Sequence, residues 1–401
     1  MAEGEGIENH AVTLQPQIKY NMENRRINLA VVFGSRSVEH EVSVVTALQI
    51  LENADKEKYN LIPLYIDKLG KWHTGQALLD IQNYKDPQEL LAKVAEGYLY
   101  DSKINTNSPV PFVKTSEKID VVFPAVHGTF GEDGTIQGLL EMSGIPYVGA
   151  GVTGSAVGMD KVLQKDILRQ NGIPVPDYQL LLREDWEKTR KIKVKFPAVV
   201  KPANLGSSVA VTKVRNQKEL EMAIDLAAQF DRRIIIEECL ENVIEINCSV
   251  LGYKTLEASV CEQPVKSTDL LSYEDKYLKG SKTKGMASLS RLIPAPIPTA
   301  LTKKIQETAK KVFRILDASG VARIDFFVDV KKNKIWVCEI NTLPGSISFY
   351  LWEKSGYPFP KLVDKLVELA YERFNDRKKT QYSFSSNLLQ TLGKGAKGTK
   401  N

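Results

Sequence analysis

Two short runs in the last third of the chain carry oxygen donors at a spacing suited to a magnesium site. The runs RIDFFVDV and KIWVCEIN follow one another closely, and each is typical of a strand. Side chains alternate between the faces of a strand, so Arg323 and Asp325 share one face of the first run, and Glu339 shares one with Asn341 in the second. Such a set suits Mg²⁺ bound against phosphates, with Arg323 neutralising a transferring phosphoryl group. Solvent-facing charges of a hairpin would give the same spacing.

Two lysines are candidates for binding an anion. Lys201 ends the apolar run PAVV, and a buried ammonium is costly unless it meets a negative charge. The turn Gly206-Ser207-Ser208 that follows offers backbone N–H groups and hydroxyls that could close over phosphates or a small acid. Lys161, at the start of a predicted helix, could likewise pair with a phosphate. A glycine-rich turn alone is more often structural than functional.

A third group of residues lies near the N-terminal end. His127 ends an apolar run and precedes a glycine-rich loop, although a satisfied structural histidine is the commoner outcome. Glu39 and Glu41 precede a helix, where acids suit the helix dipole; a functional carboxylate here would hold a substrate ammonium. The chain has no GxxxxGK[ST] motif, so a nucleotide site of the P-loop kind is excluded. GEDG lacks the alternating acids of an EF-hand.

The composition is that of a globular protein with two or three domains. The 401 residues are 43% hydrophobic and 26% charged, and the net charge is +5. Six cations and no acid lie in 377–401, so the basic balance belongs to a tail and a nucleic-acid-binding face is not indicated. The four cysteines are widely separated, and neither a signal peptide nor a membrane-spanning run is expected. We therefore expect a cytoplasmic protein with reduced thiols and no membrane partner.

The elements that position these residues change in kind along the chain. The segment 27–67 reads as a buried strand, a helix and a second strand, which predicts a parallel α/β sheet with Gly34 to Glu41 at its ligand-binding edge. From 153 we expect one long helix and then a strand hairpin over 197–214, typical of α+β structure. Four strands and two helices, around 299–318 and 357–375, fill the last third, where a long polar stretch occupies 272–288.

Seven motifs follow one another: VEHEVS, HGTFGEDGTIQG, GMDK, KPANLGSSV, YEDKY, ARIDFFVD and EINTLPG. In this order and at these intervals they resemble the D-alanine–D-alanine ligases of the ATP-grasp superfamily, over roughly residues 27 to 375. The resemblance implies a three-domain ATP-grasp architecture with an N-terminal parallel-sheet domain. The expected parts are a disordered tail (1–26), a substrate-binding α/β domain (27–150), a central ATP-grasp lid domain (151–244), a catalytic ATP-grasp domain (245–375) and a disordered basic tail (376–401).

The resemblance also implies a nucleotide site. ATP would lie between the second and third domains, with Lys161 and Lys201 on its phosphates and the Ser207-Ser208 turn above them. Glu237 would lie near the adenine and Glu245 near the ribose, although the turn ENVIE between these acids is one residue longer than is usual in the family. Two Mg²⁺ ions, which Mn²⁺ can replace, would be held by the set found above from spacing: Asp325, Glu339 and Asn341.

The amino-acid site is implied in the same way. Glu39 would hold the ammonium of the first D-alanine, and His127 would lie beside its carboxylate. Ser207 and Tyr277 would tie Glu39 to a lid formed by 272–288, and closure of that lid would keep water from the intermediate. Three further groups complete the expected site: Lys276 on the second carboxylate, the Gly345 N–H as an oxyanion donor, and Arg323 facing the transferred phosphate and the later tetrahedral centre.

One departure bears on the second substrate. After NTLPG the chain reads SISFYLWE, which puts Tyr350 where the family commonly has a serine that binds the second carboxylate. Ser346 and Ser348 are nearby and could take over that role. Tyr277 in YEDKY resembles the dipeptide-forming enzymes, so we favour an amine as the second nucleophile.

The implied function is ATP-dependent joining of two D-alanines through an acyl phosphate, for peptidoglycan precursor synthesis. A homodimer is implied by the resemblance alone. An alternative is an ATP-grasp ligase with another second substrate, such as D-serine or D-lactate. A non-catalytic ATP-binding module is disfavoured because Arg323, Asp325 and Glu339 all remain. Nucleic-acid binding through the basic tail is the least favoured reading.

Overall fold

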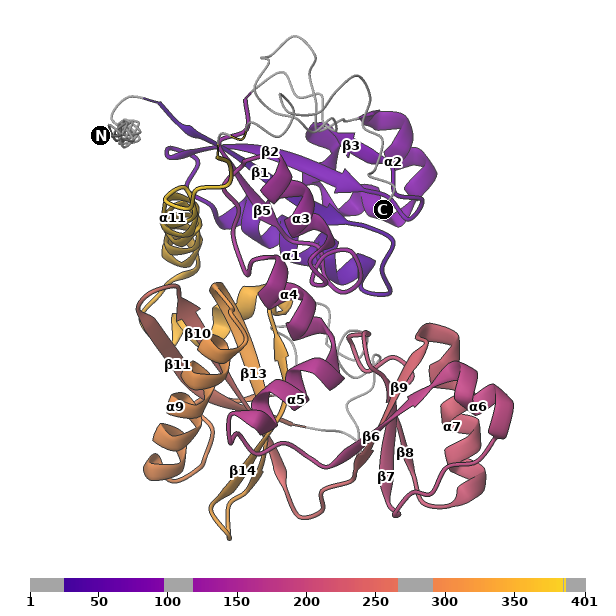
Figure 1. The fold of residues 1–401 in the computed structure, drawn as a ribbon. Coiled ribbons are helices and arrows are strands. Elements are labelled where there is room, and N and C mark those ends of the chain that lie inside the picture. The colour runs from indigo at the N-terminus through magenta and orange to yellow at the C-terminus, as the bar shows by residue number, and fades with distance from the viewer. Residues whose placement is uncertain (1–24, 97–117, 266–290, 385, 387–401) are drawn as a thin grey trace, which may run out of the picture.

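The computed structural model describes residues 25–96, 118–265, 291–384 and 386. Three sheets, each with its own helices, succeed one another along the chain (Figure 1). The α/β and α+β class predicted from the sequence is confirmed. None of the helices in the described ranges combines the length and the apolar character that crossing a membrane requires.

The first sheet has the strand order β4-β3-β2-β1-β5. The predicted β-α-β unit over 27–67 is confirmed, because β1 pairs in parallel with β2 on one side and with β5 on the other. The short strands β3 and β4 add an antiparallel edge. The elements are β1 (Ile27–Gly34), α1 (His40–Asn53), β2 (Tyr59–Ile66), β3 (Trp72–Thr74), η1 (Gln76–Leu79), η2 (Ile81–Lys85), α2 (Pro87–Lys93), β4 (Ala95–Glu96), β5 (Val121–Pro124) and α3 (Thr135–Met142).

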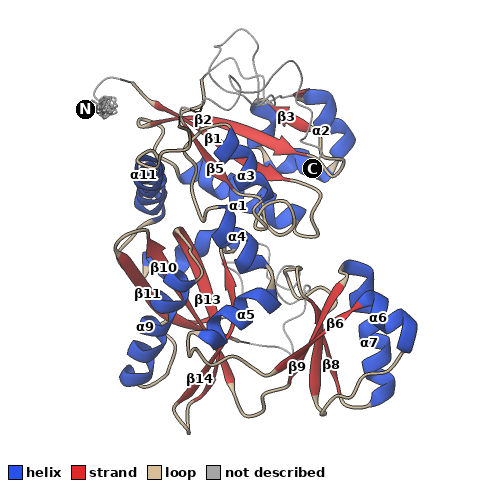
Figure 2. Cartoon of the chain, viewed as in Figure 1, coloured by secondary structure: helices blue, strands red, loops and turns tan. Residues whose placement is uncertain are grey.

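The second sheet, in the order β6-β9-β7-β8, is antiparallel throughout. The predicted hairpin over 197–214 is confirmed, since Ala198 pairs with Val214 and Val200 with Thr212. Figure 2 shows two helices on the outer side of this sheet, where Trp186 and Ile224 enter its core. The elements are β6 (Tyr178–Leu182), α6 (Arg183–Thr189), β7 (Ala198–Pro202), β8 (Thr212–Val214), α7 (Gln217–Phe230) and β9 (Arg233–Glu238).

Two helices link the first and second sheets, where the sequence predicted one. α4 (Val152–Met159) ends before α5 (Lys161–Gln170) begins. The break lies at Asp160, whose backbone is extended and whose carboxylate accepts hydrogen bonds from the N–H groups of Val162 and Leu163. An aspartate in this position is a favourable N-cap, so a new helix starts at Lys161.

The third sheet has the order β12-β11-β10-β13-β14. The predicted strands and helices of the last third are confirmed, and α9 packs on one face of the sheet with Phe313 and Ile324 in the shared core. Alternate residues of β10 and β13 face the other way, toward the site. The elements are β10 (Ile244–Gly252), β11 (Leu256–Pro264), β12 (Arg291–Leu292), α9 (Thr299–Ile315), β13 (Gly320–Asp329), β14 (Lys334–Asn341), η4 (Gly345–Ser348), α10 (Phe349–Glu353) and α11 (Phe359–Arg377).

Helix α11 connects the last part of the chain to the first. It runs two residues past the expected domain end at 375. Its side chains Leu362 and Leu366 share one hydrophobic core with Leu29 of β1 and Phe123 of β5, and Figure 1 shows the helix beside the first sheet. Arg373 adds a polar contact, stacking on Tyr147 with its guanidinium carbon 4.1 Å from the ring centroid. The N-terminal sheet is therefore completed by the C-terminal helix.

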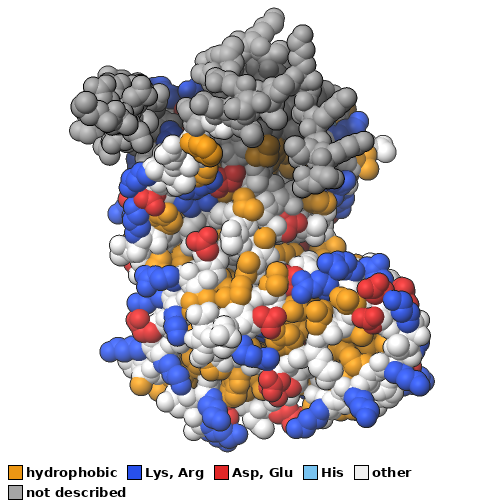
Figure 3. Space-filling model, viewed as in Figure 1, with side chains coloured by type: hydrophobic (Ala, Val, Ile, Leu, Met, Phe, Trp, Pro, Cys, Tyr) orange, Lys and Arg blue, Asp and Glu red, His pale blue; other side chains and the backbone are white. Residues whose placement is uncertain are grey.

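The surface gives no sign of a continuous basic stripe on the face that Figure 3 shows. Lys and Arg side chains are dispersed among acidic and uncharged ones over both lobes of that face. The basic tail beyond 384 lies, apart from Ser386, outside the described residues.

Candidate active site

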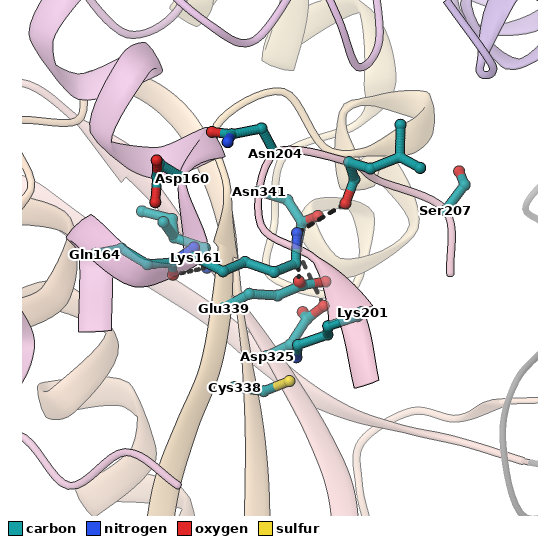
Figure 4. A network of polar contacts seen from close by, with 12 residues as sticks. Asp160, Lys161, Gln164, Lys201, Asn204, Ser207, Asp325, Cys338, Glu339 and Asn341 are labelled. Carbon is teal, nitrogen blue, oxygen red and sulfur yellow. Dashed lines mark hydrogen bonds and ion pairs between the residues drawn. The ribbon is translucent and has the colours of Figure 1, made fainter. Parts of the chain in front are cut away.

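A network of lysines and carboxylates lies between the second and third sheets (Figure 4). Lys201 is the second-last residue of β7, and its ammonium lies 2.9 Å from the carboxylate of Glu237 on the neighbouring β9. Lys165 lies 3.2 Å from the other carboxylate oxygen of Glu237 and donates to the Cys338 carbonyl on β14. Lys161 lies 3.5 Å from Glu339 and donates to the Leu205 carbonyl. The ammonium groups of three lysines thus converge where β7, β9 and β14 meet.

The buried charges in this network stabilise one another. Burial opposes ionisation of Glu237, which is 3% exposed, but the Lys165 and Lys201 ammoniums outweigh burial and hold the pKa of its carboxyl below its usual value. Burial likewise opposes the charge on Lys201, yet Glu237 raises the pKa of its ammonium. Burial raises the pKa of the Cys338 thiol to about 12, so this cysteine stays a neutral thiol. Glu237 and Lys201 therefore both stay charged although they are buried.

A patch of oxygen donors lies beside the lysines on β13 and β14. Asp325 is directly opposite Glu339 in the strand register, and Arg323 is opposite Asn341. The Arg323 guanidinium donates two hydrogen bonds of 2.7 Å to Asp325, and the Asn341 amide donates a third of 3.0 Å. Burial disfavours the charge of Arg323, but Asp325 raises the pKa of the guanidinium, which remains a cation. The four side chains predicted to form the cage therefore lie at paired positions of β13 and β14, and their role as a metal site stays a prediction.

Two carboxylates and an amide fit Mg²⁺, a hard cation that takes oxygen ligands and tends to share them with phosphates. Within the described ranges, no group of three or more His, Cys, Asp or Glu side chains is arranged to hold a metal. A cation at Asp325 and Glu339 would thus take further oxygens from Asn341 and from bound phosphate. It would also share Asp325 with Arg323, the present partner of that carboxylate.

Glu39, at the start of α1, connects the N-terminal part of the chain to the loop after β7. Its carboxylate accepts a hydrogen bond from the Ser207 hydroxyl, although Glu39 precedes α1 and Ser207 lies in the loop after β7. Two glycines make room for it, because a Cβ on Gly206 or on Gly128 would collide with the carboxylate. Gly128 also has φ of +71°, a conformation that side chains rarely adopt. Glu39 therefore occupies a cradle of glycine backbone, defined by Gly128 and Gly206.

His127 joins the first sheet to the turn after β14. Its Nδ1 lies 3.0 Å from the Leu343 carbonyl, which can only accept, so Nδ1 carries a proton. Its Nε2 lies 2.8 Å from the Thr46 hydroxyl, which also accepts from the Ser346 N–H at 3.0 Å. In the neutral ring, Thr46 donates to Nε2. His127 is 2% exposed, and this chain of bonds fixes the turn against α1.

The turn after Gly345 is conformationally strained. Ser346, Ile347 and Ser348 have φ of 52°, 47° and 52°, three consecutive left-handed residues that are not glycine. Left-handed backbone costs an L-residue roughly 1–2 kcal/mol and is normally visited by single residues. The hydroxyl oxygens of Ser346 and Ser348 are buried and have no hydrogen-bond partner in the part of the chain that the structure describes. Strain of this kind concentrates where a backbone must present groups to a ligand.

Tyr350 follows this turn and faces the third sheet. Its hydroxyl donates to Glu262 on β11 at 3.0 Å, and the guanidinium carbon of Arg291 lies 3.9 Å from its ring centroid. Burial raises the pKa of Tyr350 to about 12, and Glu262 acts in the same direction. The phenol is therefore a neutral hydrogen-bond donor, and its oxygen is directed at a protein carboxylate.

Two family models match nearly all of this framework. The D-ala D-ala ligase N-terminus matches residues 28–150, and the D-ala D-ala ligase C-terminus matches residues 167–368. A D-alanine–D-alanine ligase of Thermosipho melanesiensis is 41% identical over 366 residues, which cover 91% of this chain and 98% of that relative. The chain belongs to the D-alanine–D-alanine ligase family.

Solved structures of this family have the same architecture. The D-alanine–D-alanine ligase of Coxiella burnetii aligns with a TM-score of 0.73 and 32% identity, covering 89% of this chain and 97% of that one. A D-Ala:D-Ser ligase from Enterococcus faecalis aligns at 0.71 and 30%, covering 86% and 100%. The Bacillus anthracis D-alanine–D-alanine ligase complexed with ATP aligns at 0.63 and 25%, covering 88% and 99%. The predicted ATP-grasp fold is confirmed.

Most residues that the family resemblance singled out come together in the structure. The first sheet and the loop after β7 bring Glu39 to Ser207, and β13 and β14 bring Asp325 to Glu339. Glu237 on β9 faces two lysines, while Glu245 is the second residue of β10 and lies opposite Phe327. Lys276 and Tyr277 lie outside the described residues, as does the lid predicted over 272–288. Ser208 lies in the loop after β7, with φ of 60°.

Sequence reasoning missed several members of the site. Lys165 follows Lys161 by four residues on α5, a spacing that puts both on one helix face and could have found it. Thr46 and Glu262 had no such signal, because Thr46 contacts His127 and Glu262 contacts Tyr350 across more than eighty residues of sequence. The register of the sheet alone places Glu262 opposite Asn247 and Asn247 opposite Asp325.

Proposed function

We propose that the chain joins two D-alanines into D-alanyl-D-alanine at the expense of ATP, through an acyl phosphate. One observation carries the proposal: Arg323 and the oxygen cage on β13 and β14 lie beside converging lysines, while Glu39 reaches the same region from the first sheet. The lysines and the oxygen cage would form a phosphate-binding half, and Glu39 would form an ammonium-binding half facing it. An amino-acid carboxylate held by such a pair would meet the terminal phosphate of ATP.

The lysines would bind the nucleotide phosphates. Lys161 and Lys201 provide buried ammoniums for the phosphates. The Ser207-Ser208 turn, whose backbone is in the left-handed region, would add N–H donors to the same phosphates. Asp325, Glu339 and Asn341 would hold Mg²⁺, which would neutralise charge on the β- and γ-phosphates and polarise the transferring group. We keep Glu237 and Glu245 as candidates for contacts to the adenine and the ribose.

Glu39 would orient the first D-alanine. Its carboxylate lies in the glycine cradle and is fixed by Ser207, so it can bind an ammonium without first moving. His127, tied to Thr46 and Leu343, would lie beside the substrate carboxylate. Lys276 and Tyr277 would add contacts from the polar stretch. The carboxylate oxygen then attacks the γ-phosphorus, ADP leaves, and D-alanyl phosphate is formed.

Arg323 and the Gly345 N–H would stabilise the second step. The amine of the second D-alanine attacks the acyl carbon, the C–O bond to phosphate breaks, and a dipeptide, phosphate and a proton are released. Negative charge develops on the carbonyl oxygen and on the leaving phosphate, and fixed donors stabilise such charge strongly in a dry site. The buried hydroxyls of Ser346 and Ser348 are candidate ligands of the second carboxylate.

The proposed function predicts a D-alanine-dependent release of ADP from Mg-ATP, with a product whose mass is that of the dipeptide. L-alanine serves as the control, since it has the same chemical groups in the opposite configuration. ADP release with a D-alanyl hydroxamate in hydroxylamine but without a dipeptide would point to another second substrate, such as D-serine or D-lactate. No ADP release with any amino acid would contradict the proposal and favour a non-catalytic module.

Gly206→Ala is expected to raise the KM for the first D-alanine by about tenfold or more, because the new methyl group collides with the Glu39 carboxylate. Gly138→Ala, on α3, is the matched control. A Cβ at Gly138 meets nothing within 4 Å, so this change should leave kinetics unaltered and slightly stabilise the helix. Equal kinetics in the two variants, measured by ADP release against D-alanine concentration, would show that Glu39 does not bind this substrate.

The remaining parts of the expectation stay proposals. We propose domain limits at 27–150, 151–244 and 245–375. Helix α11, at the end of the third domain, packs on the sheet of the first domain. Assembly as a homodimer is checked by light scattering of the purified chain. A cytoplasmic location would agree with a reaction that consumes ATP, and fractionation of cells tests it.

A further inference from the structure

A buried unit of four side chains lies on the site face of the third sheet, and the proposed function leaves it unused. Glu262 is at its centre, 1% exposed. One carboxylate oxygen accepts from the Tyr350 hydroxyl and from the Asn247 amide, each at 3.0 Å. The other accepts from a terminal nitrogen of Arg291 at 3.0 Å. Each of these groups is oriented by at least one contact to another member.

This unit lies on the opposite side of Arg323 from the phosphate-binding lysines. Strand β13 is flanked by β14, which carries Glu339, and by β10, which leads through β11 to Arg291 on β12. Asp325, Asn247 and Glu262 form one row across these strands, each directly opposite the next. An acyl phosphate at Arg323 would therefore have ADP on its β14 side. A second amino acid would then approach from the β12 side.

Arg291 has the chemistry that a carboxylate needs. A guanidinium carries five N–H donors in one plane, so it can contact a protein carboxylate and a substrate carboxylate together. Its plane is fixed from two directions, by the ion pair with Glu262 and by the Tyr350 ring at 3.9 Å. The Tyr350 hydroxyl donates to Glu262, so Tyr350 is not assigned as a direct ligand of the substrate carboxylate. The strained turn with its buried Ser348 hydroxyl ends two residues before Tyr350.

We propose that Arg291 binds the carboxylate of the second amino acid, and that Tyr350 and Glu262 are positioning residues that hold its guanidinium in place. The inference rests on the proposed function, since it assigns the acceptor half of that site. It makes residue 350 a determinant of specificity through Arg291. A second substrate with a carboxylate next to its attacking group is preferred over one without.

The experiment compares two nucleophiles for the same acyl phosphate. Arg291→Gln is assayed with D-alanine and with D-alaninamide, which has the amine but no carboxylate, and with hydroxylamine, which tests the first step alone. We expect the KM for the second D-alanine to rise about 20-fold or more, while D-alaninamide and hydroxamate formation stay within about twofold. An unchanged KM for D-alanine, or an equal loss with D-alaninamide, would overturn the inference.

Two further variants keep the test decisive. If Arg291→Gln does not fold, Arg291→Lys, which keeps the charge and loses the planar fork, should show the same selective rise in KM to a smaller extent; an equal rise for both nucleophiles would overturn the inference. Tyr350→Phe retains the ring and should change the KM for D-alanine less than Arg291→Gln does. If the unaltered protein forms no D-alanyl hydroxamate, the proposed function itself has failed, and a normal hydroxamate yield with an insensitive Arg291 rejects this inference alone.

Discussion

Arg323→Ala is expected to lower the rate of dipeptide formation by about 10³-fold or more. The guanidinium is the cation between the oxygen cage and the proposed acyl centre, and it is held rigidly by two hydrogen bonds of 2.7 Å to Asp325. Alanine removes charge that would stabilise both the transferring phosphoryl group and the tetrahedral centre. Single-turnover assays should show slow formation of the hydroxamate as well as of the dipeptide.

The fold should survive this change. Asp325 keeps the hydrogen bond from Asn341 and its place in the strand register, so far-ultraviolet circular dichroism should be unaltered. Arg314→Ala, which removes an exposed arginine from α9, is the control and should retain full activity. Turnover close to normal in Arg323→Ala would remove this residue from the mechanism.

Glu237→Gln is expected to lower the free energy of unfolding by about 3 kcal/mol at pH 7. The change removes the carboxylate that lies 2.9 Å from Lys201 and 3.2 Å from Lys165, and it leaves two buried ammoniums without that counter-charge. Urea unfolding without nucleotide measures the effect. Glu238→Gln, at the adjacent exposed position of β9, should change stability by less than about 0.5 kcal/mol.

The contribution of Glu237 to stability is also expected to depend on pH. The pKa of Glu237 is lower in the folded chain than the value of about 4.3 that an unfolded glutamate has. Its contribution to stability is therefore complete above that unfolded value and is lost as the pH falls through the folded pKa. The stability difference between the unaltered protein and Glu237→Gln should be constant from about pH 6 to 8 and shrink below about pH 4. A difference that grows in acid would contradict the assigned direction.

Local sequence pattern predicted those parts of the fold whose stabilising contacts are close in the chain. The apolar run over 27–34 is typical of a buried strand, and the residues over 197–214 carry both strands of a hairpin and its turn. Strand alternation predicted which residues of each strand share a face, Arg323 with Asp325 and Glu339 with Asn341. The register of β13 against β14 brings the two pairs together. The break at Asp160 was missed since helical periodicity continues across it; the capping aspartate was the available signal.

Contacts between sheets could not be obtained in this way. No residue near Glu39 in the sequence indicates that it contacts Ser207. The glycine cradle likewise combines Gly128, from the loop after β5, with Gly206, from the loop after β7. His127 was singled out, but its partners Thr46 and Leu343 depend on how α1 and the turn after β14 meet. The family resemblance supplied roles for such residues. It supplied none for Glu262 and Arg291, whose importance follows only from the register of the third sheet and the orientation of Tyr350.

The packing of α11 on the first sheet has a consequence for how the chain is made. During synthesis β1, β2 and β5, which end at residues 34, 66 and 124, leave the ribosome long before Leu362 and Leu366, with which they share a core. The apolar face of the first sheet that α11 covers therefore stays exposed, or is bound by chaperones, until synthesis is nearly complete. A nascent chain stopped before 359 would therefore contain every strand of the first sheet and still lack part of its core. Final closure of the N-terminal lobe is a late event, timed by the last helix.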